Sequence, residues 1–322
     1  KGGLHNRITC RLQLHPFNLR ETKEYLVSRK IKLNDMHVLD LYMVMGGIPY
    51  YLNFIECGKS AEQNIQEICF SKNGVLLSEF ERLFYSLFDT AEINLRLIRE
   101  IAKKRDGISR DELIKATKMS SGGTFNKRIN ELQAAGFIQG FIPFRNVKKD
   151  QHFRVIDEYS VFYLKWIDPL IAKGFPQNSY WKMCSRGSQW DVWGGYAFEC
   201  VCFKHVPQIL RALHLESIAC EVGNWRYMPK RGSKTTGAQV DLLFDRLDNA
   251  VTLCEIKYCS GKFGISKSYA KELHQKMDVF REITHTKKQL FLALITTLGL
   301  KQSLWNDELV TNEVTLQDLF AF

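Results

Sequence analysis

The spacing of apolar residues predicts that residues 1–90 are mainly helical. Asn18 and Glu21 stand three residues apart at the start of the stretch NLRETKEYLV, which is the spacing of a capping box. Further on, Gly46, Gly47 and Pro49 interrupt an apolar run, and such residues end one helix and allow the next to begin. We therefore expect a bundle of short helices in this part of the chain.

Residues 91–157 have the pattern of helices followed by strands. Ile93, Leu97, Ile98 and Ile101 form one apolar stripe on a first helix, and Ser109 with Glu112 has the spacing of a capping box for a second. The remaining expected elements are a third helix over 120–136, strands over 137–144 and 152–157, and a basic turn over 145–151. This order predicts a winged helix-turn-helix.

Residues 158–188 are expected to connect two folded regions. The stretch 159–171 (YSVFYLKWIDPLI) is dense in aromatic residues at helical spacing, which favours a helix packed between domains. A stacking platform for nucleic-acid bases is the alternative interpretation. Residues 176–188 are rich in Ser, Gly, Asn and Gln, as is typical of a linker.

Two β-type runs, 238–245 and 251–258, flank Asp248 and Asn249 and predict a β-hairpin. Alternation along the strands places Gln239, Asp241 and Leu243 on one face of the first strand, and Leu253, Glu255 and Lys257 on one face of the second. Carboxylates between apolar residues cost several kcal/mol to desolvate unless a positive charge pairs with them. Lys257 or a divalent metal is expected to supply that charge.

An Asp on one strand and Glu-x-Lys on the next, here Asp241, Glu255 and Lys257, resemble the PD-(D/E)XK nuclease superfamily. The stretch 190–206 (WDVWGGYAFECVCFKHV) resembles the first core helix of that superfamily, and Glu199 is its candidate acid. With a helix over 267–283 and a strand over 288–296, the resemblance implies an α-β-β-β-α-β domain over residues 189–322.

The chemistry implied by this resemblance is hydrolysis of a phosphodiester that depends on Mg²⁺. Asp241 and Glu255 are expected to bind the metal through oxygen, and Lys257 to position water or stabilise developing charge. Glu199 is expected to add a ligand or orient water, and Gln239 to support Asp241 from the same face.

A second resemblance covers the first part of the chain. The motifs 2–7 (GGLHNR), 14–26 (LHPFNLRETKEYL) and 42–52 (YMVMGGIPYYL) are similar, in the same order, to the end of the nucleotide-binding domain and the helical lid of archaeal-type ATPases of the AAA/STAND group. The resemblance implies an ATPase domain upstream, and Arg7 is a candidate nucleotide sensor. The sequence contains no G-x-x-x-x-G-K-[ST], so we expect ATP binding only in a longer chain.

Charge and cysteine content add to these expectations. The 322 residues carry a formal net charge of +10, which favours an anionic partner such as DNA. Residues 91–150 contain 13 Lys and Arg against 7 Asp and Glu, so the DNA contacts are expected there, through Lys127, Arg128, Lys148 and Lys149. Nine cysteines without a C-x-x-C pair indicate reduced thiols and a cytoplasmic location, and no apolar run has the length of a membrane span.

The sequence thus predicts a mixed α and α/β protein of several domains: a helical lid (1–90), a winged helix (91–157), a connection (158–188) and a nuclease-like domain (189–322). The first functional hypothesis is a Mg²⁺-dependent nuclease acting on DNA. The alternative is a non-catalytic regulatory module that binds DNA or protein and keeps a degenerate nuclease fold. Pairing of Glu255 with Lys257, without room for a metal or phosphate between the acids, is the feature that favours the alternative.

Overall fold

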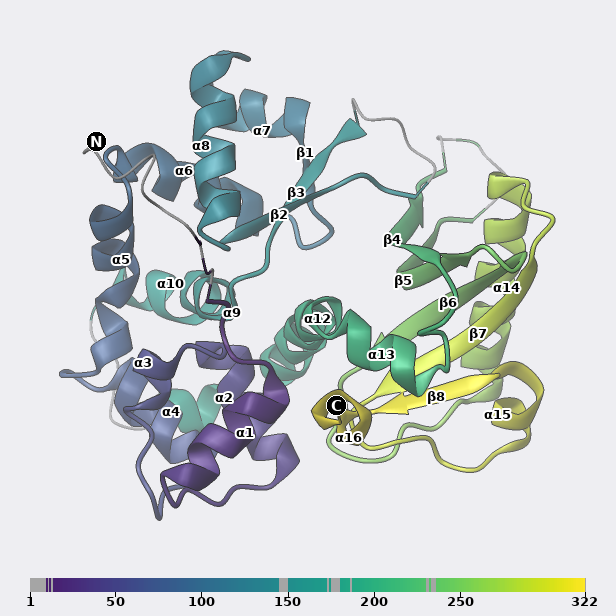
Figure 1. The fold of residues 1–322 in the computed structure, drawn as a ribbon, viewed down its shortest axis with the longest axis horizontal. Coiled ribbons are helices and arrows are strands. Elements are labelled where there is room, and N and C mark those ends of the chain that lie inside the picture. The colour runs from purple at the N-terminus through teal and green to yellow at the C-terminus, as the bar shows by residue number, and fades with distance from the viewer. Residues whose placement is uncertain are drawn as a thin grey trace.

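The computed structural model describes residues 10, 12, 14–144, 150–172, 174, 180–185, 187–229, 232 and 236–321. It is a mixed α/β structure in which helices form one side and a five-stranded mixed sheet forms the other (Figure 1). Arg7, Lys148 and Lys149 lie outside the described residues. Within the described part of the chain, no helix combines the length and the apolar character needed to span a bilayer.

Short helices make up the described part of the first ninety residues from Leu19 onward, as predicted. Their bounds are α1 (Leu19–Ser28), α2 (Asp35–Met45), α3 (Pro49–Leu52), α4 (Ala61–Phe70), the 3-10 helix η1 (Val75–Leu77) and α5 (Glu79–Leu87). The capping box before α1 is confirmed: the backbone N–H of Glu21 donates to Asn18 Oδ1 at 2.8 Å, and that of Asn18 donates to Glu21 Oε2 at 2.9 Å.

The two glycines between α2 and α3 allow a close approach of two backbone segments. Gly46 ends α2 with φ +64°, a conformation that favours glycine. The N–H of Phe17 donates to the carbonyl of Gly47 at 2.8 Å, and a Cβ on Gly47 would lie 1.8 Å from the carbonyl oxygen of Phe17. No side chain fits at position 47, so the motif holds the entry to α1 against the end of α2.

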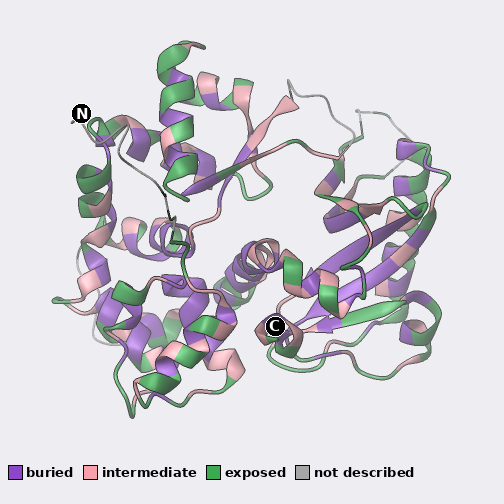
Figure 2. Ribbon diagram, in the orientation of Figure 1, coloured by how far each residue is buried: buried purple, intermediate pink, exposed green. Residues whose placement is uncertain are grey.

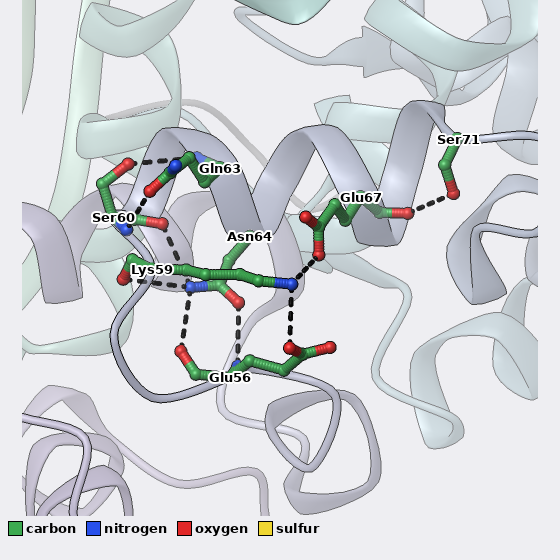
Figure 3. Close-up of polar contacts among 7 residues, drawn as sticks. All are labelled: Glu56, Lys59, Ser60, Gln63, Asn64, Glu67 and Ser71. Atoms are coloured by element: carbon green, nitrogen blue, oxygen red, sulfur yellow. Dashed lines mark hydrogen bonds and ion pairs between the residues drawn. The ribbon is translucent and has the colours of Figure 1, made fainter. Parts of the chain in front are cut away.

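The loop before α4 is fixed by a cluster of polar contacts (Figure 3). The buried side chain of Asn64 accepts the N–H of Glu56 at 2.8 Å and donates to the carbonyl of Ser60 at 3.0 Å. Ser60 and Gln63 form a capping box, while Lys59 pairs with Glu56 at 2.8 Å and with the carboxylate of Glu67. Most backbone groups that the turn would leave unpaired thus find partners in neighbouring side chains.

Within 158–185, residues 158–172 and 180–185 pack into the N-terminal helices, whereas part of the predicted linker, residues 176–179 and 186, lies outside the described residues. This segment contains α9 (Glu158–Phe162), the π-helix η3 (Tyr163–Ile167), α10 (Asp168–Ile171) and α11 (Tyr180–Cys184). The ring of Tyr163 stacks on Phe80 with centroids 4.3 Å apart, and Trp181 stacks on Phe70 at 5.2 Å. The hydroxyl of the fully buried Tyr159 donates to the carbonyl of Leu76. Because these rings are buried, they are unavailable as a stacking platform for bases.

Residues 91–157 fold as helices against a small antiparallel sheet. The elements are α6 (Ala91–Ala102), β1 (Ile108–Ser109), α7 (Arg110–Thr117), α8 (Gly123–Ala134), β2 (Ile138–Phe141) and β3 (His152–Val155), and the strand order is β1-β3-β2. Leu97, Ile98 and Ile101 of the predicted stripe are buried, together with Phe125 and Phe153. The capping box of Ser109 and Glu112 is present at the start of α7.

A mixed sheet of order β4-β5-β6-β7-β8 dominates the C-terminal part, and its central strands are buried (Figure 2). Strands β4 to β6 are antiparallel, whereas β6, β7 and β8 are parallel. The bounds are α12 (Ser188–Lys204), α13 (Val206–Ala212), β4 (Cys220–Tyr227), β5 (Ala238–Arg246), β6 (Ala250–Lys257), α14 (Lys267–Thr284), β7 (Gln289–Thr296), α15 (Leu304–Leu309), β8 (Asn312–Thr315) and α16 (Leu316–Phe320).

Helices cover both faces of this sheet. Phe198 and Val201 of α12 share one apolar core with Leu242 and Ile256, whereas Leu273 and Phe280 of α14 belong to a second core with Leu243 and Leu253. The core on the α12 side continues without interruption into the N-terminal helices.

Two contacts attach the N-terminal helices to the C-terminal part. The N–H of Leu19 donates to Nε2 of the buried His205 at 3.0 Å, and the Nδ1 of His205 lies 2.8 Å from the carbonyl of Val201. Burial lowers the pKa of His205 to about 4, so the ring is neutral and can accept. The hydroxyl of Tyr258, directly after β6, donates to Asp40 of α2 at 2.8 Å. In addition, α16 packs on α1.

Gly194 and Gly195 of α12 offer a matched test of this packing. A Cβ on Gly194 would lie 2.8 Å from the ring of Tyr258, whereas a Cβ on Gly195 meets nothing within 4 Å. We expect Gly195→Ala to raise the free energy of unfolding by about 0.5–1 kcal/mol. Gly194→Ala should lower it, because overpacking costs about 1–3 kcal/mol and displaces the ring that bonds Asp40. Denaturant unfolding measures both, and equal stabilisation by the two variants would contradict the packing described.

Candidate active site

The predicted hairpin is formed by β5 and β6. Leu242 lies opposite Cys254, and the same register carried one residue further places Asp241 opposite Glu255. The backbone ladder ends at this point, and the N–H of Ile256 instead donates to Oδ2 of Asp241 at 3.0 Å. The two acids therefore meet where the paired strands separate.

A β-bulge in β5 interrupts the alternation of faces that was expected from the sequence. Gly223 of β4 pairs with Leu243 and Trp225 pairs with Val240, so Asn224 alone faces the two residues Asp241 and Leu242. Strict alternation would place Val240 with Leu242, but Val240 shares the core of Leu243 on the α14 side. The extra residue turns the strand locally, and such bulges re-aim side chains at the edges of sites. Gln239 and Asp241 consequently line a cavity together with Glu199 of α12.

Glu255 is buried and held by three donors. Its Oε1 lies 2.9 Å from Nζ of Lys257 and accepts the hydroxyl of Tyr269 at 3.1 Å, while its Oε2 accepts from Nζ of Lys276. Burial alone would raise the pKa of Glu255, but Lys276 and Lys257 hold it below its ordinary value. Burial also opposes the charge of Lys257, yet Glu255 keeps the pKa of Lys257 above its ordinary value. Both groups are therefore ionised at neutral pH.

Glu199 and Asp241 have the opposite electrostatic environment. Burial, followed by repulsion from Asp241 and Asp106, raises the pKa of Glu199 to about 8. Burial and repulsion from Glu255 raise the pKa of Asp241 to about 6. Glu199 has no hydrogen bond or ion pair with any other described residue, and the charge of Lys257 offsets the repulsion only in part. Carboxyl groups crowded in this way retain protons at neutral pH or attract a cation.

A small cavity of about 20 Å³ lies between these acids, which is enough for one water molecule. Asp106, in the loop between α6 and β1, lines it together with Glu199, Asp241, Gln239 and Arg154. The guanidinium of Arg154 lies 3.5 Å from the centre of the Phe203 ring of α12, which fixes the 91–157 region over the site. Arg154 thus brings residues of the predicted winged helix next to the acids of the predicted nuclease-like domain.

Sequence reasoning missed Asp106, Tyr269 and Lys276. Nothing local distinguishes Asp106, which lies in a loop 135 residues before Asp241. Lys276 did carry a signal, because Tyr269, Leu273, Lys276 and Phe280 are spaced to lie on one face of a helix, and a lysine within an apolar stripe needs a buried anion.

The donor set at the site suits a hard cation. Glu199 and Asp241 offer carboxylate oxygens, and Mg²⁺ takes one or two carboxylates while keeping several waters or phosphate oxygens. Among the described residues, no group of three or more His, Cys, Asp or Glu side chains is arranged to hold a metal. Glu199 and Asp241 therefore supply two carboxylates and no closed metal cage.

The four residues expected to contact nucleic acid have different positions. Lys127 is exposed on α8, and Lys148 and Lys149 fall outside the described residues. The expectation for Arg128 is wrong, because its side chain is buried, donates to Oγ1 of Thr90 at 2.5 Å and pairs with Glu131 at 2.7 Å. Arg128 lies three residues after the buried Phe125, so helical geometry turns it inward.

The comparisons with known proteins do not assign the chain to a family. A scan against protein-family models found no match, and a search of curated proteins found no significant similarity. A functional site at Glu199 and Asp241 is therefore inferred from the geometry alone.

Replacing Arg128 and Lys127 separately tests the corrected surface. Arg128→Ala should lower the free energy of unfolding by about 2 kcal/mol, because it removes the hydrogen bond to Thr90 and leaves Glu131 with Asn94 but without its cationic partner. Lys127→Ala, one residue away and exposed, should change stability by less than about 0.5 kcal/mol. Urea unfolding of both variants is the measurement, and equal effects would show that Arg128 is not buried.

The raised pKa of Glu199 predicts how stability depends on pH. Between the ordinary value of 4.5 and about 8, the folded protein retains a proton that the unfolded chain releases, so this group lowers stability as pH rises through that range. We expect Glu199→Gln to gain stability relative to the wild type between pH 4.5 and 8, with little further change above pH 8. Thermal unfolding across this range measures the difference, and two parallel curves would be incompatible with a protonated Glu199.

Proposed function

We propose that residues 189–322 are a PD-(D/E)XK-like nuclease domain that hydrolyses DNA with Mg²⁺. The observation that carries this proposal is the meeting of Asp241, Glu255, Lys257 and Glu199 where β5 and β6 separate. Acids that raise one another's pKa at a strand end are costly for a purely structural site, and perturbed carboxyls of this kind concentrate at functional sites.

The order of elements supports this proposal. Helix α12, the antiparallel strands β4 to β6, helix α14 and the parallel strand β7 occur in the order α-β-β-β-α-β, with the short helix α13 inserted between α12 and β4. In the same way, the order α6, β1, α7, α8, β2 and β3 supports a winged helix over 91–157, with the exposed Lys127 on its third helix.

In this proposal each residue has a defined role. Asp241 and Glu199 would hold Mg²⁺. Glu255, which the sequence suggested as a ligand, is instead held by Lys257, Lys276 and Tyr269. The metal would supply an acidified water and neutralise charge on the phosphate. Lys257 cannot act as a base because it stays protonated, so it stabilises negative charge developing on a phosphate oxygen. Gln239 lines the same cavity as Asp241 and would support it there.

We also propose that the chain is the C-terminal region of an ATP-binding protein of the archaeal-type ATPase group. The tight Phe17–Gly47 contact gives the lid-like glycine motif an architectural reason, which supports the resemblance. ATP would bind only to an upstream domain, because this chain has no phosphate-binding loop.

One observation favours the alternative, a non-catalytic module that binds DNA or protein. Both oxygens of Glu255 are occupied by the ammonium groups of Lys257 and Lys276, so its charge is balanced without a metal. In that case the charged residues at the end of β6 would serve packing only.

Asp241→Asn distinguishes the two functions. If the site is catalytic, this change should lower the Mg²⁺-dependent cleavage rate at least about 10²-fold, the scale for losing one group that stabilises the transition state. Asp248→Asn, in the turn of the same hairpin, should retain wild-type cleavage because its carboxylate pairs with Arg246 far from the metal ligands. Gel assays of labelled DNA with Mg²⁺, Mn²⁺ or Ca²⁺ give the rates. Absence of cleavage by the wild-type protein with every metal would favour the non-catalytic module.

A further inference from the structure

A groove of about 710 Å³ runs between the end of α6 and strand β4. Four cations line it, Lys103, Lys104, Arg105 and Arg226, against the two acids Asp106 and Glu112. The side chains come from two regions far apart in sequence, residues 103–152 and 224–239. Lys103, Lys104 and Arg226 pair with Glu100, Glu112 and Asp106, whereas Arg105 pairs with no acid among the described residues. The positive charge of Arg105, and of Arg226 once released from Asp106, suits a polyanion.

The groove leads to the candidate active site. Arg105, Asp106, Asn224 and Gln239 line both the groove and the small cavity that contains Glu199 and Asp241. A chain lying in the groove would therefore pass next to the acids.

Asp106 occupies the junction between groove and cavity. Its Oδ2 accepts from Nη1 of Arg226 on β4, and its Oδ1 accepts from Nε2 of Gln239 on β5 at 3.4 Å. A guanidinium and an amide that converge on one carboxylate also match two oxygens of a phosphate group. Arg226 and Asp106 are 45% and 43% exposed, so a ligand can reach both.

We propose that this groove binds a single strand of nucleic acid, with Arg226 and Gln239 receiving one backbone phosphate in place of Asp106. The proposal rests on the proposed function, since it supplies the path by which a phosphodiester reaches Asp241. Asp106 acts as an internal competitor that holds the phosphate position until the strand displaces it.

The lining of the groove favours a single strand over a duplex. Phe141 and His152 line it as partly exposed aromatic rings, 5.8 Å apart, and unpaired bases stack on such rings in cationic grooves. Duplex DNA is instead bound by protruding helices or ribbons that enter its own grooves. DNA and RNA strands share the required phosphates and bases, so the experiment includes both.

The test is binding of fluorescent oligo(dT) and oligo(rU), about 12 nucleotides long, in EDTA so that no cleavage occurs. Arg226→Ala should weaken binding about tenfold and reduce the slope of log affinity against log salt by about 0.7, the value for one phosphate contact in a single strand. Asp106→Asn should tighten binding several-fold, because it removes a negative charge and frees Arg226. Arg211→Ala is the matched control: this arginine on α13 is also half exposed and paired with a glutamate.

Several results would overturn the proposal. One is an unchanged affinity of Asp106→Asn for the strands, and another is an equal loss of affinity in Arg211→Ala and Arg226→Ala. A third is tighter binding of a duplex, with an affinity that neither groove variant changes. The proposed function fails separately: strands that bind in EDTA as described but remain uncut with Mg²⁺ would support the groove and refute the nuclease. Preference for dT or for rU identifies the strand and supports the proposal in either case.

Discussion

Helix α12 carries apolar side chains around more than half of its circumference, and different parts of the chain cover different parts of that surface. Strand β6 covers one side, α2 and α9 cover another, and Arg154 of β3 lies on its Phe203. A helix that is apolar over so wide an arc must be buried on several sides. The arrangement of the other regions follows from this requirement, and so does the position of Glu199, which the same helix carries.

Burial around α12 also sets the electrostatics of the candidate site. Water is largely excluded where Glu199 approaches β5, so carboxyl groups there interact more strongly than they would on a surface. Glu255 is kept ionised by two lysines, whereas Glu199 and Asp241 are pushed toward their protonated forms. One site thus contains an ionised acid, Glu255, beside acids that favour the protonated form. A cation bound by a protonated acid would have to displace its proton.

The sequence was sufficient for features determined by local residues. The capping boxes at Asn18 and Ser109 and the β5–β6 hairpin depend on neighbours within a few positions, and they are present. The bulge at Asp241 depends on pairing with β4, which sequence alternation along a single strand does not reveal. The approach of Asp106 depends on how two regions pack, so it left no local signal. Arg128 could have been placed correctly, since it shares a helical stripe with Phe125 and Leu132.

The uninterrupted apolar core has a consequence for how the protein unfolds. It extends from Leu19 to Leu319 and includes Trp193 of α12, so the expected boundary between residues 188 and 189 does not separate two independent cores. A fragment starting at residue 189 would expose the tryptophans that α11 and α9 cover, and a fragment ending there would lose the helix on which those segments pack. We therefore expect the N-terminal helices and the C-terminal sheet to unfold together rather than as separate domains.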